Sequence, residues 1–166
     1  AIIPIHMNKL VSTGSTGYLY SFEGQNLFFD KQYIDWLDRY VRNLSSLNAK
    51  IYFRLLWESE DTTLNNGNEN KKYILPDLSS VEYVNKLYAY CDFLSDRYST
   101  FEYGKLTGII LGKSLDDRQL YLRNSAMTAR EYADMLARYG IIVGVATRNN
   151  IPSLDIAYSF SNDNSY

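Results

Sequence analysis

Apolar positions along the chain fall into two kinds of segment, short continuous runs and longer amphipathic stretches. The short runs predict four strands, over residues 2–5, 50–57, 106–111 and 154–160. The run Ile109-Ile110-Leu111 is unbroken, which is typical of a parallel strand covered on both faces. Pro4 has no backbone N–H for a sheet ladder, so we expect the first strand at a sheet edge or bulged there.

The first amphipathic stretch predicts a helix after Asp30, a residue type that caps helix N-termini. Its predicted buried stripe consists of Tyr33, Leu37, Tyr40, Leu44 and Leu47. On the outer side we expect two ion pairs at i, i+4 spacing, Asp35 with Arg39 and Asp38 with Arg42.

Two capping boxes predict the starts of the other two helices, Ser79-x-x-Glu82 and Thr128-x-x-Glu131. The predicted buried stripe of the second helix is Val84, Leu87, Cys91, Leu94 and Tyr98. That of the third is Tyr132, Leu136, Tyr139, Val143 and Ala146. Residues 140–146 could alone form a strand, but the link to the strand at 154–160 is too short for a parallel crossover. We therefore expect one helix to about residue 148.

This alternation of strands and helices predicts an α/β fold with parallel strands, in one domain over residues 1–166. A small β-hairpin over 18–29 precedes the first helix, and the polar segment 62–72 is expected to be a surface loop. The sheet is either doubly wound or part of a (β/α)8 barrel. A barrel takes about 250 residues, so this chain would supply about half of one, as a segment of a larger barrel. Both architectures bind ligands beyond the carboxyl ends of their strands.

Charge and composition exclude several classes of function. Seventeen basic and 19 acidic side chains give a formal net charge of -2, too small and of the wrong sign to bind nucleic acid. No apolar run approaches the roughly 20 residues that a membrane helix needs, so no membrane insertion is expected. One cysteine and one histidine provide neither a disulfide nor a zinc site, and no metal or cofactor is predicted.

Four segments carry a resemblance to a known family. They are residues 18–38 (YLYSFEGQNLFFDKQYIDWLD), 49–57 (AKIYFRLLW), 93–112 (FLSDRYSTFEYGKLTGIILG) and the third helix. Together they resemble a glycoside-hydrolase-like (β/α)8, or TIM, barrel family of largely uncharacterised bacterial proteins. The resemblance implies a partial barrel, a carbohydrate ligand and an extracellular or cell-surface location. It also implies an Asn-Glu pair after the strand that ends in Ile-Ile-x-Gly, with the glutamate as general acid/base.

The chain departs from that pattern at the catalytic position, because Lys113 and Ser114 stand where Asn-Glu is expected. Retaining glycosidases need two carboxyl groups about 5 Å apart, and an ammonium and a hydroxyl cannot replace them. We therefore expect a degenerate barrel that binds carbohydrate or scaffolds a larger surface protein. Two alternatives stay open: an active hydrolase with carboxylates at Glu58 or outside this chain, and an assembly domain whose sheet edges pair with another chain.

Candidate site residues follow the predicted strand ends. Glu58 is a candidate catalytic carboxylate, and Trp57 beside it offers a ring on which a sugar can stack. The alternative is that Trp57 closes the core and Glu58 is surface charge.

The other candidates lie after the first and third predicted strands. Asp116 and Asp117 are either substitute catalytic carboxylates or a solvated turn. His6 is either a proton carrier or ligand contact, or a packed side chain. Lys113 and Ser114 are candidate ligand contacts at the rim.

Overall fold

The computed structural model describes residues 1–12, 14, 16–58, 73–75, 78–116 and 127–161. In chain order its elements are β1 (Ile2–His6), the 3-10 helix η1 (Met7–Lys9), β2 (Tyr18–Phe22), β3 (Gln25–Phe29), α1 (Lys31–Ser46), β4 (Tyr52–Glu58), β5 (Tyr73–Ile74), α2 (Val81–Arg97), β6 (Gly108–Leu111), α3 (Ala129–Arg148) and β7 (Asp155–Tyr158). The predicted surface loop at 62–72 lies outside the described residues.

The four predicted strands are confirmed, with slightly different bounds, and they form one parallel sheet in the order β1-β4-β6-β7. The short strand β5, which the pattern did not predict, pairs antiparallel with the end of β4. β1 is an edge strand, as Pro4 requires, and its remaining ladder with β4 is continuous from Ile2 to His6. The fold is therefore mixed α/β.

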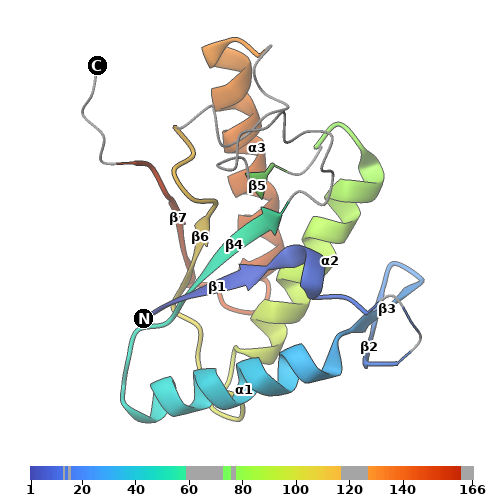
Figure 1. Cartoon of the computed structure of the whole chain (residues 1–166), viewed down its shortest axis with the longest axis vertical. Coiled ribbons are helices and arrows are strands. Elements are labelled where there is room, and N and C mark those ends of the chain that lie inside the picture. The colour runs from blue at the N-terminus through green and yellow to red at the C-terminus, as the bar shows by residue number, and fades with distance from the viewer. Residues whose placement is uncertain (13, 15, 59–72, 76–77, 117–126, 162–166) are drawn as a thin grey trace, which may run out of the picture.

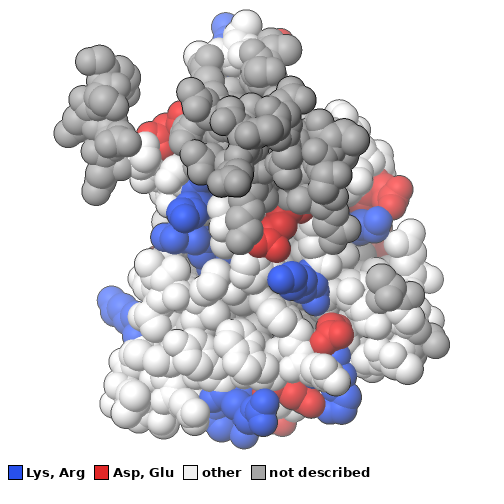
Figure 2. Space-filling view, viewed as in Figure 1, with Lys and Arg blue, Asp and Glu red and all other residues white. Residues whose placement is uncertain are grey.

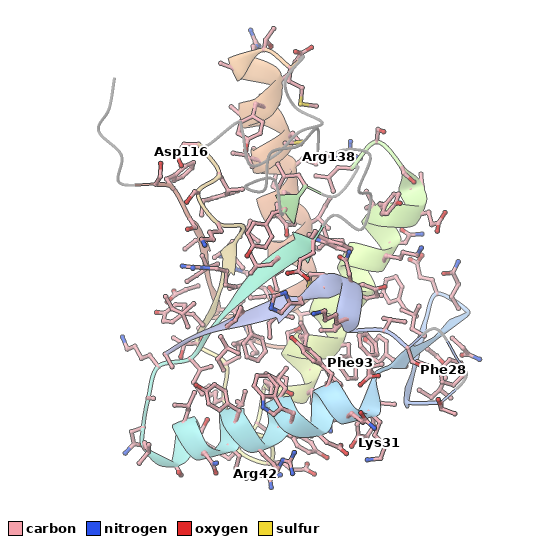
Figure 3. All side chains as sticks on the ribbon, in the orientation of Figure 1. Phe28, Lys31, Arg42, Phe93, Asp116 and Arg138 are labelled. Carbon is pink, nitrogen blue, oxygen red and sulfur yellow. The ribbon has the colours of Figure 1, made fainter. Side chains whose placement is uncertain are left out.

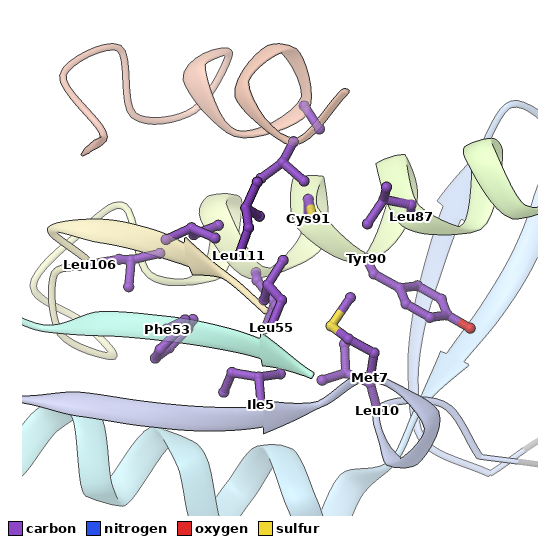
Figure 4. Packing of buried hydrophobic residues seen from close by; sticks show 14 of the residues in the cluster. Ile5, Met7, Leu10, Phe53, Leu55, Leu87, Tyr90, Cys91, Leu106 and Leu111 are labelled. Carbon is purple, nitrogen blue, oxygen red and sulfur yellow. The ribbon is translucent and has the colours of Figure 1, made fainter. Parts of the chain in front are cut away.

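The three long helices cover one face of this sheet, and right-handed crossovers between neighbouring parallel strands account for that arrangement. α2 lies between α1 and α3 (Figure 1). The covered face presents alternate strand residues, among them Ile5, Phe53 and Leu111, which pack against Leu87 and Cys91 of α2 (Figure 4). The opposite face carries Ile2, Pro4, Tyr52, Arg54, Asp155 and Ala157, which are exposed or half-buried, and Leu56 near the carboxyl end of β4, which is buried. We call it the open face.

The predicted hairpin over residues 18–29 is confirmed, and its two strands are joined by a tight turn. Phe22 pairs with Gln25, so the connection is the two residues Glu23 and Gly24. Both have positive φ, 46° and 78°, as a type I′ hairpin turn requires. The hairpin packs on α2 through stacked rings of Phe29 and Phe93, whose centroids lie 3.6 Å apart.

The buried stripe of α1 differs from the predicted one. Ile34, Leu37 and Val41 are buried, whereas Tyr40 and Leu47 are exposed, so the prediction is wrong at those two positions. Asp38 is also buried rather than paired with Arg42 at the surface. The helix is rotated toward α2 because Asp38 has its partner there. Asp30 caps α1 as predicted, accepting a hydrogen bond from the Tyr33 backbone N–H.

The buried pair of Asp38 and Arg97 joins α1 to α2. Arg97 donates from Nε and Nη2 to the two carboxylate oxygens at 2.8 and 2.6 Å, and the Tyr98 hydroxyl donates to Oδ1 at 2.8 Å. The guanidinium lies over the rings of Tyr18 and Tyr103, with its carbon 4.4 and 4.1 Å from their centroids. Burial alone would lower the pKa of Arg97, but hydrogen bonding and attraction to Asp38 raise it above its ordinary value.

The two predicted capping boxes have different outcomes. In α3 the box is present, since Thr128 and Glu131 exchange side-chain and backbone hydrogen bonds, and all five residues of the predicted stripe are buried. In α2 the box prediction is wrong. The N-cap is Ser80, one residue later than predicted, and its side chain makes no capping hydrogen bond.

We expect Asp38→Asn to lower the free energy of unfolding by about 3 kcal/mol, because it leaves a half-buried guanidinium without its counter-charge. Urea denaturation followed by circular dichroism measures the change. The control is Asp96→Asn, an exposed carboxylate on α2, which should change stability by less than about 0.5 kcal/mol. Equal effects of the two variants would contradict a central role for the pair.

The single cysteine should be chemically silent in the folded chain. Cys91 is fully buried on α2, and burial raises the pKa of its thiol. Since the thiolate is the nucleophile, we expect an aromatic disulfide reagent to react with the thiol only after unfolding in denaturant. Fast labelling of the native protein would contradict this packing.

The raised pKa of the Cys91 thiol also contributes to the pH dependence of stability. It favours the folded state below the ordinary thiol pKa, and this contribution is lost as the pH rises above that value.

Candidate functional site

The carboxyl ends of the parallel strands meet at one edge of the sheet, and several polar side chains are brought together there. His6 ends β1 and Glu58 ends β4, its neighbour in the sheet. Side chains alternate between faces along a strand, so His6 lies on the same face as Pro4, and Glu58 on the same face as Arg54. Both residues therefore stand at the rim of the open face.

His6 and Glu58 form the centre of this cluster. His6 Nδ1 lies 3.3 Å from Glu58 Oε1, a distance for an ion pair when the imidazole is protonated, although the angle is not that of a hydrogen bond. Lys9 Nζ lies 3.9 Å from Glu58 Oε2, and the Asn8 side-chain amide donates to the Glu58 carbonyl at 2.5 Å. The turn η1 after β1 positions Asn8 and Lys9, so β1 and the turn that follows it both contact Glu58.

Tyr33, in the first turn of α1, connects the helix layer to this cluster. Its hydroxyl accepts a hydrogen bond from the His6 backbone N–H at 3.3 Å. Burial raises the pKa of Tyr33, the hydrogen bond from His6 opposes the rise, and the charge of Glu58 adds to it. The phenol therefore remains protonated, and its bond to His6 fixes the end of β1.

Lys113 and Ser114 follow β6, the next strand along the same edge. Gly112 and Ser114 both have positive φ, 62° and 51°, so the chain turns sharply at this point. Lys113 is exposed and Ser114 is half-buried. The two residues predicted to occupy the rim therefore do follow a strand on the same edge as Glu58.

Asp116 holds this loop against the end of β7 (Figure 3). Its Oδ1 accepts the Ser161 backbone N–H at 2.5 Å, and its Oδ2 accepts the Ser161 hydroxyl. Hydrogen bonds from Ser161 lower the pKa of Asp116, so it is ionised at neutral pH. The carboxylate thus performs a structural task. Asp117, its neighbour in the prediction, lies outside the described residues.

Trp57 faces the helices rather than the open face. Its ring stacks on Tyr90 of α2 at a centroid distance of 6.1 Å, and only 8% of the residue is exposed. Its position agrees with the interpretation that Trp57 closes the core beneath the site. Truncation to alanine would cost about 3–5 kcal/mol of stability, which makes it a poor probe of ligand binding.

Sequence reasoning missed the residues of the open face that lie below the rim. In the lower row, formed by Tyr52, Gly108 and Asp155 at the same register, the Tyr52 hydroxyl donates to Asp155 Oδ2 at 3.2 Å across Gly108. Arg54 lies one row higher on the same strand as Tyr52. Part of the signal was present in the sequence: in residues 52–55, the polar Tyr52 and Arg54 alternate with Phe53 and Leu55, although Leu56 interrupts the alternation.

Other kinds of site receive no support from the described residues. No group of three His, Cys, Asp or Glu side chains among them is arranged to hold a metal ion. None of the helices in the described ranges combines the length and apolar character of a membrane-spanning segment. On the face shown in Figure 2, basic and acidic side chains are interspersed rather than gathered into one basic patch.

The chain matches one known protein family over nearly its whole length. The model of a protein family of unknown function, DUF5722, matches residues 1–164. The chain belongs to the DUF5722 family. A comparison with curated proteins found no match.

Membership in DUF5722 does not bring an activity with it. The family match identifies no glycoside hydrolase, so the resemblance to glycosidase-like barrels stays a prediction for this DUF5722 chain. The clustering of His6 with Glu58 is therefore the main guide to its function.

Packing around Gly108 in the lower row of the open face can be tested in the DUF5722 chain by substituting this glycine, with a glycine of α3 as the control. A Cβ on Gly108 would lie 2.7 Å from the Asp155 carbonyl oxygen and 2.8 Å from the Tyr52 ring, so Gly108→Ala should cost about 1–3 kcal/mol. At Gly144 in α3 a Cβ meets nothing within 4 Å, so Gly144→Ala should raise stability by up to about 1 kcal/mol. Urea unfolding midpoints check both, and a neutral Gly108→Ala would contradict this packing.

Proposed function

We propose that this DUF5722 chain is part of a glycosidase-like (β/α)8 barrel and binds carbohydrate at the carboxyl edge of its sheet. The strand order supports the barrel. Neighbours in the sheet follow chain order, β1-β4-β6-β7, without the reversal that defines a doubly wound sheet. Parallel sheets are almost always covered on both faces, so the open face would be the interior of the barrel, closed by its remaining strands.

The observation that carries the binding proposal is the 3.3 Å approach of His6 Nδ1 to Glu58 Oε1 at two adjacent strand ends. With Lys9 and Asn8, these groups gather donors and acceptors at the rim where barrels bind their ligands. A sugar presents several hydroxyl groups, each of which both donates and accepts. The Glu58 carboxylate can accept a hydrogen bond from such a hydroxyl, and the His6 imidazole can donate one to it.

The hydrogen bonds and ionisation of Asp116, the other candidate carboxylate at this edge, support binding rather than hydrolysis. A retaining glycosidase needs two carboxyl groups about 5 Å apart, one of them protonated. Asp116 is occupied with Ser161 and held ionised, and Lys113-Ser114 replaces the expected catalytic pair. Hydrolysis would therefore require a second carboxylate from outside the described residues.

Glu58→Gln should weaken binding of a soluble oligosaccharide by about tenfold or more, because hydrogen bonds to a charged group contribute about 1.5–3 kcal/mol. Isothermal titration calorimetry of the protein against a panel of neutral and acidic oligosaccharides measures the change. Release of reducing ends over the same panel tests for hydrolysis.

The matched control is Glu82→Gln on α2, whose carboxylate is 71% exposed and pairs with Lys86 on the same helix. It should bind like the unmodified protein. Binding that Glu58→Gln leaves unchanged would refute the assigned site. Failure to bind any sugar would leave only a scaffolding role, whereas turnover abolished by Glu58→Gln would establish a hydrolase.

A further inference from the structure

Two covered polar atoms at the rim lack a hydrogen-bond partner among the described residues, and both belong to side chains that contact Glu58. His6 Nδ1 is one of them, 3.3 Å from Glu58 Oε1. The other is Asn8 Oδ1, whose amide nitrogen donates to the Glu58 carbonyl at 2.5 Å. A covered polar atom without a partner costs free energy. The rim therefore holds a nitrogen and an oxygen that are suited to bind a further group.

The geometry of His6 and Glu58 fits two ligands of one metal ion. Nδ1 and Oε1 both carry lone pairs, which repel each other at 3.3 Å unless a proton or a cation lies between them. A proton on Nδ1 would not point at Oε1, because the contact lacks the angle of a hydrogen bond. Zinc bonds to nitrogen and oxygen of about 2.1 Å, meeting at a tetrahedral angle, hold the two ligand atoms about 3.4 Å apart. The observed separation is therefore that of two atoms that share a cation.

The two side chains stand above an apolar floor, at the rim rather than in the part of the sheet that a closed barrel would fill. His6 is in register with Leu56, which is buried, and Glu58 follows Leu56 on the same face of β4. The side chains of His6 and Glu58 are 26% and 19% exposed, so solvent reaches them from the rim. An ion bound there would have an entry path and open coordination positions.

Lys9 opposes a cation at this position, but its placement limits the effect. Its Nζ lies 3.9 Å from Oε2, the other oxygen of the carboxylate, and its side chain is 65% exposed. An exposed ammonium is screened by solvent and its long side chain can turn away. Tyr33 brings no charge to the cluster, and its hydroxyl accepts from the His6 backbone N–H, which leaves Nδ1 unused.

We propose that His6 Nδ1, Glu58 Oε1 and Asn8 Oδ1 bind a divalent transition-metal ion, for which Zn²⁺ is the best match. Imidazole suits Zn²⁺ and its neighbours in the first transition row, whereas Ca²⁺ and Mg²⁺ prefer oxygen ligands alone. Water or a ligand completes the coordination. The metal site stands without the proposed carbohydrate function, and only a role of the ion in binding saccharide hydroxyl groups rests on that function.

Calorimetric titration of the metal-free protein, prepared without a histidine tag, with ZnCl₂ tests the site. We expect one bound Zn²⁺ per chain, and we expect His6→Gln and Glu58→Gln each to weaken binding at least tenfold, since changes outside the ligand set already cost about 10–100-fold. MgCl₂ and CaCl₂ should bind at least about tenfold more weakly than ZnCl₂. The matched control is Glu82→Gln on α2, whose exposed carboxylate pairs with Lys86; it should bind Zn²⁺ like the unmodified protein.

Lys9→Gln distinguishes a metal site from a simple ion pair of His6 with Glu58. Removing the ammonium should strengthen Zn²⁺ binding by about two- to fivefold, because a like charge near the ion is lost. An affinity that Lys9→Gln leaves unchanged or lowers would overturn the location of the site. Asn8→Ala should weaken Zn²⁺ binding, because it removes the amide oxygen.

Thermal unfolding provides a second readout, which serves if His6→Gln fails to fold. An ion that binds only the folded state stabilises it, so Zn²⁺ should raise the unfolding midpoint of the unmodified protein but not that of Glu58→Gln. Equal shifts in the two proteins would overturn the inference, as would the absence of Zn²⁺ binding or binding that survives both His6→Gln and Glu58→Gln.

Calorimetry of the oligosaccharide panel in the presence of EDTA separates this inference from the proposed function. Saccharide binding in EDTA, together with no binding of Zn²⁺, would mean that the metal site is wrong and the proposed function stands. Zn²⁺ binding that depends on His6 and Glu58, together with no bound saccharide at any metal concentration, would support the metal site and refute the proposed function.

Discussion

A parallel sheet is stable when both of its faces are covered, and this chain covers one of them. The strands follow one another in the sheet in chain order, and the crossovers between them are right-handed. For this reason α1, α2 and α3 all pack on the same face of the sheet. The other face keeps Ile2 and Pro4 exposed and presents Arg54 half-buried. That asymmetry links the architecture to the function, since the rim of the uncovered face carries His6 and Glu58, the residues proposed to bind the ligand.

The helix layer is fixed by a polar contact as much as by apolar packing. Asp38 and Arg97 are 59 positions apart in the chain, and their bidentate pair sets the rotation of α1 against α2. The rings of Tyr18 and Tyr103 against the guanidinium connect the hairpin and the loop after α2 to the same point. Tyr33 of α1 also accepts a hydrogen bond from the backbone N–H of His6 at the end of β1. The packing of the helices and the position of His6 at the rim are therefore coupled.

Local signals predicted the local structure well. Short apolar runs located the four strands, a period of 3.6 located the stripe of α3, and the Thr128-Glu131 box marked where that helix begins. The failure at α1 had one physical cause, which is that hydrophobicity at a position says nothing about a distant partner. Asp38 was expected at the surface because its charge is costly to bury, and only Arg97 makes that burial tolerable. The Ser79-Glu82 box matched a pattern that the chain does not use, since α2 starts one residue later.

For the candidate site, the sequence determined which residue types stand at the strand ends, because a run of strand residues fixes where each strand stops and which side chains alternate to each face. His6, Glu58, Lys113 and Asp116 were all identified in that way. Only the tertiary structure decided which of them meet: parallel pairing of β1 with β4 brings His6 to Glu58, whereas the loop after β6 returns Asp116 to Ser161. Trp57 and Arg54 were separated in the same way, one into the core and the other onto the open face. Those contacts join residues tens of positions apart, and they depend on strand order and helix rotation, which no local pattern encodes.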